Sequence, residues 1–131
     1  MEGPMAQDLM AVANELVAGC REGREMQNLE ALYAEDAVSV EAAEFSEGSR
    51  TTEGREAIKG KHAWWNANFE VHGASVEGPF PHGDDRFAVI FEMDTSNRET
   101  GERSAMKEVG VYHVQDGRIT REEFFYGVPE S

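Results

Sequence analysis

Glu41 is the residue of this chain that is best placed for proton chemistry. The segment 32–41 (LYAEDAVSVE) is typical of a helix end that passes directly into a strand, and Glu41 falls on one face of that strand. A carboxylate on a core strand is unfavourable unless it lines a wet cavity or meets polar partners. Glu41 therefore faces either a wet cavity or polar partners, and in a cavity a carboxylate can take up a proton.

Three helices are predicted from the spacing of apolar residues. Met5, Leu9, Leu16 and Cys20 belong to a helical pattern that ends near Gly23. A second, short helix is predicted between Gly23 and the 32–41 segment, again from the spacing of its apolar residues. A third is expected at about 55–70, and its apolar and aromatic positions lie along one face: Ile58, His62, Trp65 and Phe69.

The remaining chain is predicted to be a sheet. The first strand is expected at about 37–44, and the polar stretch 45–54 is expected to be a loop. Later strands are predicted at 74–78, 87–94, 104–114 and 118–126, with a turn over Pro79, Pro81, Gly83 and Asp84 and a two-residue hairpin at Asp116-Gly117. The order α-α-β-α-β-β-β-β predicts a single α+β domain over residues 1–131, with a mostly antiparallel sheet.

Composition excludes several classes of partner. The 131 residues carry a formal net charge of −14, which disfavours binding to nucleic acid and to anionic membrane surfaces. No apolar run approaches the ~20 residues of a membrane span, and no secretory signal is visible. The only cysteine is Cys20, so a reduced, cytoplasmic location is expected. The histidines show no metal-ligand spacing with any carboxylate, so no metal site is expected.

Three segments resemble one known family. They are 32–37 (LYAEDA), 54–58 (GREAI), and 111–119 (VYHVQDGRI) followed by 122–126 (EEFFY). Together they make the chain similar to the nuclear transport factor 2-like superfamily, in its SnoaL-like (polyketide cyclase and ketosteroid isomerase) branch. The resemblance implies a curved sheet wrapped around three helices into a cone, a small-molecule pocket inside it, and a homodimer formed by the opposite sheet face.

The resemblance also implies which side chains face the pocket. Glu41 falls at the general-base position of the isomerase branch. Alignment of the last hairpin with the family, together with strand alternation, implies the inward positions of the later strands. The expected catalytic residues are Glu41 as base, with Tyr112 and Glu108 as proton donors or orienting groups. The expected ligand-binding residues are His62, Trp65, Phe69, Phe91, Glu122, Phe124 and Tyr126, and Thr120 is also expected to point inward. No cofactor and no metal are expected.

Each of these residues has a simpler interpretation. Glu41 could be solvated at a strand end, and Glu108 and Glu122 could be partners of arginine or lysine. The aromatic residues could be core residues alone, and His62 could be a hydrogen-bonded residue of the cavity wall.

The chain departs from the known enzymes at the oxyanion hole. The two donor positions of the isomerase fall near Val17 and at Gly110, and neither residue has a side-chain donor for an enolate. The Asp-Arg-Asp arrangement of the epoxide-hydrolase branch is not found. The dehydratase branch needs paired histidines, but only His62 is placed in the cavity.

Two classes of function follow. The first is a cofactor-independent isomerase, cyclase or hydratase acting on a small, largely apolar organic molecule. The second is a non-catalytic binding or sensing domain that uses the same pocket as a homodimer. A dimerisation module with a filled cone is a weaker third alternative.

Overall fold

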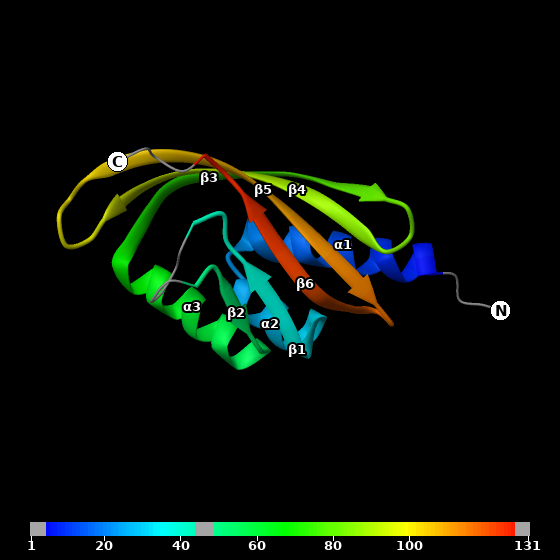
Figure 1. Ribbon diagram of the computed structural model, residues 1–131. Coiled ribbons are helices and arrows are strands. Elements are labelled where there is room, and N and C mark those ends of the chain that lie inside the picture. Colours follow the sequence, from blue (N-terminus) through cyan, green and yellow to red (C-terminus); the bar gives the residue numbers. More distant parts are fainter. Residues whose placement is uncertain (1–4, 44–48, 128–131) are drawn as a thin grey trace.

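The computed structural model describes residues 5–43 and 49–127 as three helices and six strands (Figure 1). The helices are α1 (Met5–Glu22), α2 (Glu25–Leu32) and α3 (Arg55–Asn68). The strands are β1 (Tyr33–Val40), β2 (Thr51–Glu53), β3 (Phe69–His82), β4 (Arg86–Asn97), β5 (Arg103–Gln115) and β6 (Arg118–Phe125).

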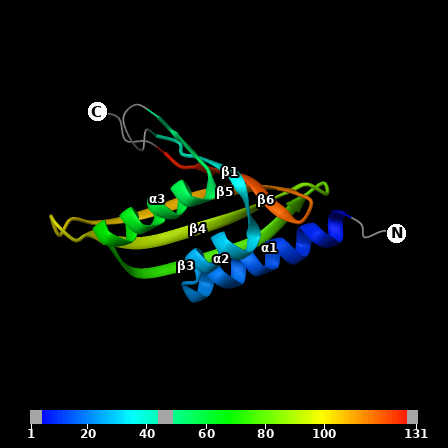
Figure 2. The same ribbon diagram turned by 90° about the horizontal axis from the view of Figure 1, so that it is seen from below.

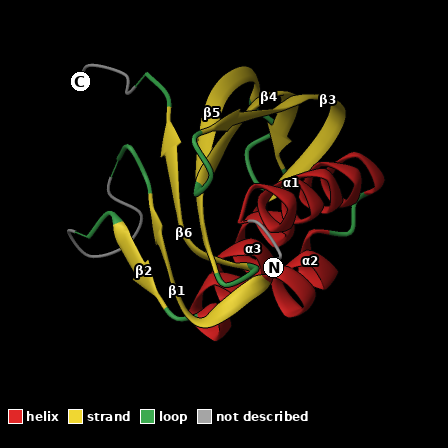
Figure 3. Ribbon diagram, turned by 90° about the vertical axis from the view of Figure 1, so that its right-hand side faces the viewer, coloured by secondary structure: helices red, strands yellow, loops and turns green. Residues whose placement is uncertain are grey.

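The six strands form one curved sheet in the order β2-β1-β6-β5-β4-β3. Strands β1 and β6 run parallel, and every other neighbouring pair is antiparallel. All three helices lie on the same face of the sheet (Figures 1 and 2), and the view in Figure 3 shows the sheet bending around them. The predicted α+β class with a curved, mostly antiparallel sheet is confirmed.

The helices are held to the sheet by their apolar faces. In α1 the buried residues Leu9, Val12 and Leu16 recur at helical spacing. Asn28 of α2 is buried and donates a hydrogen bond from Nδ2 to the carbonyl of Leu16 at 3.1 Å, which joins the two helices. Ile58 anchors α3 and is fully buried.

In the described ranges, none of the helices combines the length and the apolar character needed to cross a bilayer.

The strand that leads to Glu41 begins earlier than predicted, and it has an unexpected partner. β1 starts at Tyr33 and ends at Val40, so Glu41 is the next residue along the chain. The predicted loop contains strand β2, whose Thr52 lies opposite Ser39. Short polar strands at a sheet edge carry little apolar signal, which is why the sequence pattern missed this one. Residues 44–48 lie outside the described residues. They comprise the predicted end of the first strand and the start of the predicted loop.

The predicted turn over Pro79, Pro81, Gly83 and Asp84 is confirmed at Gly83 and Asp84 but is wrong at the prolines, because both prolines lie inside the 14-residue strand β3. β3 is an edge strand, so proline can occupy a position at which no ladder donor is needed. Its register with β4 also shifts between Glu77 and Phe80, which accommodates the interruption.

The hairpin at Asp116-Gly117 is confirmed, with φ of 53° and 74° at the two turn residues, as a type I′ turn requires. The register of the β5–β6 pair shifts next to this turn: Val114 pairs with Ile119, but His113 pairs with Arg121. Thr120 is therefore the extra residue of a bulge. The neighbouring Ile119 is fully buried in the position expected for Thr120.

Candidate functional site

A cavity of about 710 Å³ lies between the sheet and the helices. All three helices contribute to its wall, as do strands β3 to β6 and the segment after β1. Of the residues predicted for the site, these line it: Glu41, His62, Trp65, Phe91, Glu108, Tyr112, Glu122, Phe124 and Tyr126. The wall is largely apolar and aromatic with a few charged groups, as is usual for a small-molecule site.

Phe69 is the exception among the predicted binding residues. It is the first residue of β3 rather than the end of the third helix, and it is not among the described residues that line the cavity. Its ring stacks on Trp65, with 5.3 Å between the ring centroids. Phe69 therefore supports a residue of the wall instead of facing the interior.

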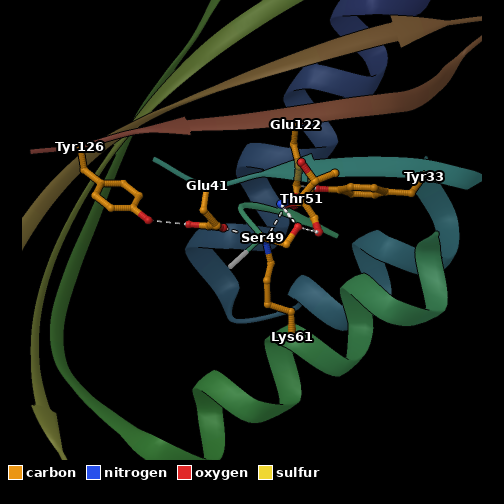
Figure 4. A network of polar contacts seen from close by, with 8 residues as sticks. Tyr33, Glu41, Ser49, Thr51, Lys61, Glu122 and Tyr126 are labelled. Atoms are coloured by element: carbon orange, nitrogen blue, oxygen red, sulfur yellow. Dashed lines mark hydrogen bonds and ion pairs between the residues drawn. The ribbon is translucent and has the colours of Figure 1, made fainter. Parts of the chain in front are cut away.

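Glu41 lies at the centre of a polar network (Figure 4). Its Oε2 is 2.6 Å from the ammonium of Lys61, and its Oε1 accepts a hydrogen bond of 2.9 Å from the hydroxyl of Tyr126. The backbone N–H of Glu41 donates to the carbonyl of Arg50 at 2.8 Å, which fixes the residue beyond the end of β1. Both carboxylate oxygens of Glu41 are thus already engaged.

Lys61 is the cavity residue that the sequence analysis missed. Its side chain is 9% exposed, and its ammonium also donates to Ser39 Oγ at 2.6 Å and lies 5.6 Å from the ring centroid of Phe124. A buried ammonium requires such partners. The available signal was spacing, because Lys61 is one turn after the buried Ile58 and therefore lies on the inner face of α3.

Glu122 is the most deeply buried carboxylate of the site, at 1% exposure. The Tyr33 hydroxyl donates a short hydrogen bond to its Oε1. Its Oε2 is buried and has no hydrogen-bond partner within residues 5–43 and 49–127. Burial first, and the Glu122 carboxylate second, raise the pKa of Tyr33 far above its usual value, so Tyr33 remains a donor. Glu122 lines the cavity, and its Oε2 stays buried there without a donor.

Glu108 projects from β5 opposite Phe91 of β4 and is half-buried. In the described part of the chain, no hydrogen bond reaches its carboxylate. Burial and the nearby charge of Glu41 raise the pKa of Glu108 to about 7; Glu122 adds to this rise, and Lys61 opposes it. Glu108 thus changes its charge near neutral pH, the range required of a general acid or base.

Tyr112 and Tyr126 supply hydroxyl groups to the same cavity. The Tyr112 ring stacks on Phe87, with 5.1 Å between centroids, and burial raises the pKa of its hydroxyl well above the usual range. Burial and Glu41 raise the pKa of Tyr126 to about 12. Both phenols therefore act as hydrogen-bond donors at neutral pH. The thiol of Cys20 also stays protonated, because burial raises its pKa to about 12.

The two positions that correspond to the isomerase oxyanion hole are packed with apolar groups. Val17 is 2% exposed. A Cβ at Gly110 would lie 3.0 Å from the Tyr112 ring and 3.2 Å from the rings of Phe124 and Phe91. In this cavity Lys61 of α3 supplies a positive charge instead. Within the described ranges, no three His, Cys, Asp or Glu side chains are arranged to hold a metal ion.

Comparison with protein families identifies this architecture. The family model described as SnoaL-like domain matches residues 8–126, nearly the whole chain. The chain belongs to the SnoaL-like domain family. A search of functionally curated proteins found no match. Because a SnoaL-like fold supports more than one activity, the chemistry has to be argued from the residues of this cavity.

Solved structures show the same fold. A Mesorhizobium loti protein named as a SnoaL-like polyketide cyclase is 40% identical, with a TM-score of 0.83, over 89% of this chain and 97% of that one. A Mycobacterium tuberculosis protein in complex with estradiol-17β-hemisuccinate is 19% identical, with a TM-score of 0.66 over 96% of both chains. A Catenulispora acidiphila protein with a ketosteroid isomerase-like fold, in complex with trimethylamine, is 22% identical, with a TM-score of 0.67 over 86% of this chain and 82% of that one.

Proposed function

We propose that this SnoaL-like protein binds a small, largely apolar organic molecule in its cavity and catalyses a cofactor-independent proton transfer on it, of the isomerase, cyclase or hydratase type. The observation that carries the proposal is the convergence of Glu41, Glu108 and Glu122 with the ammonium of Lys61 in one mostly apolar cavity. Carboxylates and an ammonium group in a partly dry site provide the groups that general acid–base chemistry needs.

The geometry favours Glu108 as the residue that exchanges the proton. Its carboxylate accepts no hydrogen bond in the described structure, whereas both oxygens of Glu41 are occupied by Lys61 and Tyr126. Its pKa of about 7 makes both protonation states available. In this proposal Glu41 positions the ammonium of Lys61. The positive charge of Lys61 then stabilises the oxyanion that develops on the ligand. Tyr112 donates a hydrogen bond that orients the ligand.

Two structural relatives support the binding part of the proposal. One is a complex with estradiol-17β-hemisuccinate and the other a complex with trimethylamine, so this fold accommodates small organic ligands in those proteins. Both share the fold at low identity. The chemistry of the ligand therefore has to come from the residues of this chain.

Hydrogen–deuterium exchange tests the catalytic part. Small apolar ketones are incubated with the protein in D₂O, and loss of the α-proton signal is followed by NMR. We expect exchange above the buffer rate, at least a hundredfold slower in Glu108→Gln and unchanged in Glu92→Gln, which removes an exposed carboxylate from β4. Equal exchange rates in wild type and Glu108→Gln would contradict the role of Glu108.

The alternative is a non-catalytic binding or sensing domain. The observation that favours it is the packing of Val17 and Gly110 at the positions where the isomerase has its donors. Calorimetry on the same ketones separates the two functions. Binding without any exchange would establish the binder and overturn the enzyme.

A homodimer remains part of the proposal. The outer face of β5 and β6 carries Phe125, which is 53% exposed, beside an Arg121–Glu123 ion pair. Light scattering should give a dimer that Phe125→Glu dissociates. Phe80→Glu is the control, because it changes an equally exposed ring on edge strand β3. A wild-type monomer at micromolar concentration would overturn the dimer. The cytoplasmic location stays a prediction from the sequence.

A further inference from the structure

The charges that line the cavity are not balanced. Among the described residues of the wall, four glutamates, Glu25, Glu41, Glu108 and Glu122, face one arginine and one lysine, Arg21 and Lys61. Lys61 is paired with Glu41 at 2.6 Å. The guanidinium of Arg21 is turned to the carbonyl of Val76, at 2.8 Å. The carboxylates of Glu108 and Glu122 therefore have no cationic side chain bonded to them in the described structure.

Glu122 shows most clearly what is missing. It is buried at 1% exposure, it lines the cavity, and its Oε2 has no hydrogen-bond partner among the described residues. A buried carboxylate oxygen without a donor is rare in folded proteins and is expensive to maintain. A donor brought by a ligand would satisfy it, and a charged donor would do so best.

Aromatic rings surround these carboxylates. Tyr112 lies directly opposite Glu122 in the β5–β6 ladder, and Phe91 lies opposite Glu108 in the β4–β5 ladder. Phe124 already has the ammonium of Lys61 5.6 Å from its ring centroid. Aromatic faces attract cations, and they also bury the apolar part of a ligand.

We propose that the cavity selects small organic molecules that carry a protonated amine on an apolar or aromatic body, with the ammonium group facing the carboxylates of Glu108 and Glu122. This inference rests on the proposed function only in requiring that the cavity binds a ligand. It adds the chemical class of that ligand. A ligand of the opposite charge would bring a carboxylate to a wall that already has an excess of negative charge.

Several titratable groups face Glu108 and enter the pH dependence of binding. They are Glu41 after β1, Lys61 and His62 on α3, Tyr112 on β5, Glu122 on β6 and Tyr126 after β6; Cys20, Arg21 and Glu25 contribute from α1 and α2. With a pKa of about 7, Glu108 loses its negative charge as the pH falls from 8 to 6. Affinity for a cation should therefore weaken over this interval.

Three probes of one shape test the inference by calorimetry: naphthylmethylamine, naphthylmethanol and naphthoate. An alkyl amine titrates at about 10 and so stays charged throughout. At pH 8 we expect the amine to bind about tenfold more tightly than the alcohol, as one partly shielded charge pair would give, and naphthoate to bind most weakly. The preference for the amine should fall at least threefold at pH 6.

Variants assign the effect to residues. Glu108→Gln should reduce the preference and remove most of its pH dependence, and Glu122→Gln should reduce it while Gln still accepts the Tyr33 hydrogen bond. The pH dependence should survive in His62→Asn, and Glu92→Gln should leave the preference unchanged. Equal affinity for amine and alcohol, or tighter binding of naphthoate, would overturn the inference. If neutral ketones exchange their α-protons while the amine does not bind, the inference fails and the proposed function stands.

Discussion

Lys61 and Glu41, twenty residues apart in the chain, form an ion pair of 2.6 Å at the inner face of the sheet, with side-chain exposures of 9% and 17%. The pair links α3 to the end of β1. Ser39 and Tyr126 complete it, each with one hydrogen bond to a member of the pair. The main polar contact between helix and sheet is therefore also the centre of the candidate site.

Removal of one member of this pair should destabilise the fold. Lys61→Met leaves the Glu41 carboxylate half-buried without its cation, and we expect the free energy of unfolding to fall by about 3–5 kcal/mol in urea titrations. The double variant Lys61→Met/Glu41→Gln should recover most of the loss, because no unpaired charge remains. Lys107→Met is the matched control. The Lys107 side chain is 65% exposed and its ammonium is 3.9 Å from Glu92, so the loss of unfolding free energy should be under about 1 kcal/mol. Equal losses at Lys61 and Lys107 would contradict the buried pair.

Glu108 should make stability depend on pH. Its folded pKa of about 7 lies above the usual 4.5, so the folded state binds the proton more tightly than the unfolded chain. The stabilisation is complete below pH 4.5 and is lost as the pH rises through 7, by up to about 3 kcal/mol. Glu108→Gln should therefore become more stable relative to wild type between pH 5 and pH 8, whereas Glu92→Gln should show no such trend. Carboxyl NMR titration gives the pKa directly, and a value near 4.5 would refute this account.

The hydroxyl of Tyr33 should contribute more to the free energy of unfolding than the hydroxyl of Tyr112, although the two residues are equally buried. Tyr33→Phe keeps the ring but leaves Glu122 without the hydrogen bond to its Oε1. We expect a loss of about 1–3 kcal/mol of unfolding free energy, because a buried acceptor becomes unsatisfied. Tyr112→Phe removes a hydroxyl that accepts or donates no hydrogen bond in the described structure, so it should be nearly neutral for stability. A cycle with Glu122→Gln shows whether the loss at Tyr33 is coupled to Glu122; additive effects would mean that it is not.

Much of this fold could be predicted from sequence because the signals are local. Helical spacing placed α1 and α2, and Asp116-Gly117 fixed the last hairpin. Strand β2 could not be predicted, because a three-residue polar strand becomes a strand only by pairing with β1. The prolines of β3 were misread for a related reason. Whether proline ends a strand depends on whether that strand lies at the edge, which is a tertiary property.

The candidate site, too, could be predicted from the sequence only in part. Strand alternation brought Glu41, Glu108 and Glu122 to one face, since period two holds along any regular strand. The bulge at Thr120 broke this rule and put Ile119 in the core. Lys61 was missed because a lysine on a helix is usually solvated, and only its partners across the cavity explain its burial. The sequence thus located the acidic groups of the cavity but missed the cation that balances one of them.

Gly110 should be intolerant of even a methyl group, although the sheet could accept alanine at Gly73. Its Cβ would lie 3.0 Å from the Tyr112 ring and 3.2 Å from the rings of Phe124 and Phe91, and these three rings line the cavity. Such crowding among large side chains typically costs about 1–3 kcal/mol. Gly110→Ala should therefore lower the thermal midpoint and reduce probe affinity together. Gly73→Ala on edge strand β3 has no heavy atom within 4 Å of the new methyl and should change neither.

If Gly110→Ala were as stable as wild type, the rings would have room to move, and the acid donor of the isomerase branch could be introduced there as Gly110→Asp. If it is destabilised as expected, that oxyanion hole is closed to this chain by packing, and charge stabilisation in the cavity has to come from Lys61.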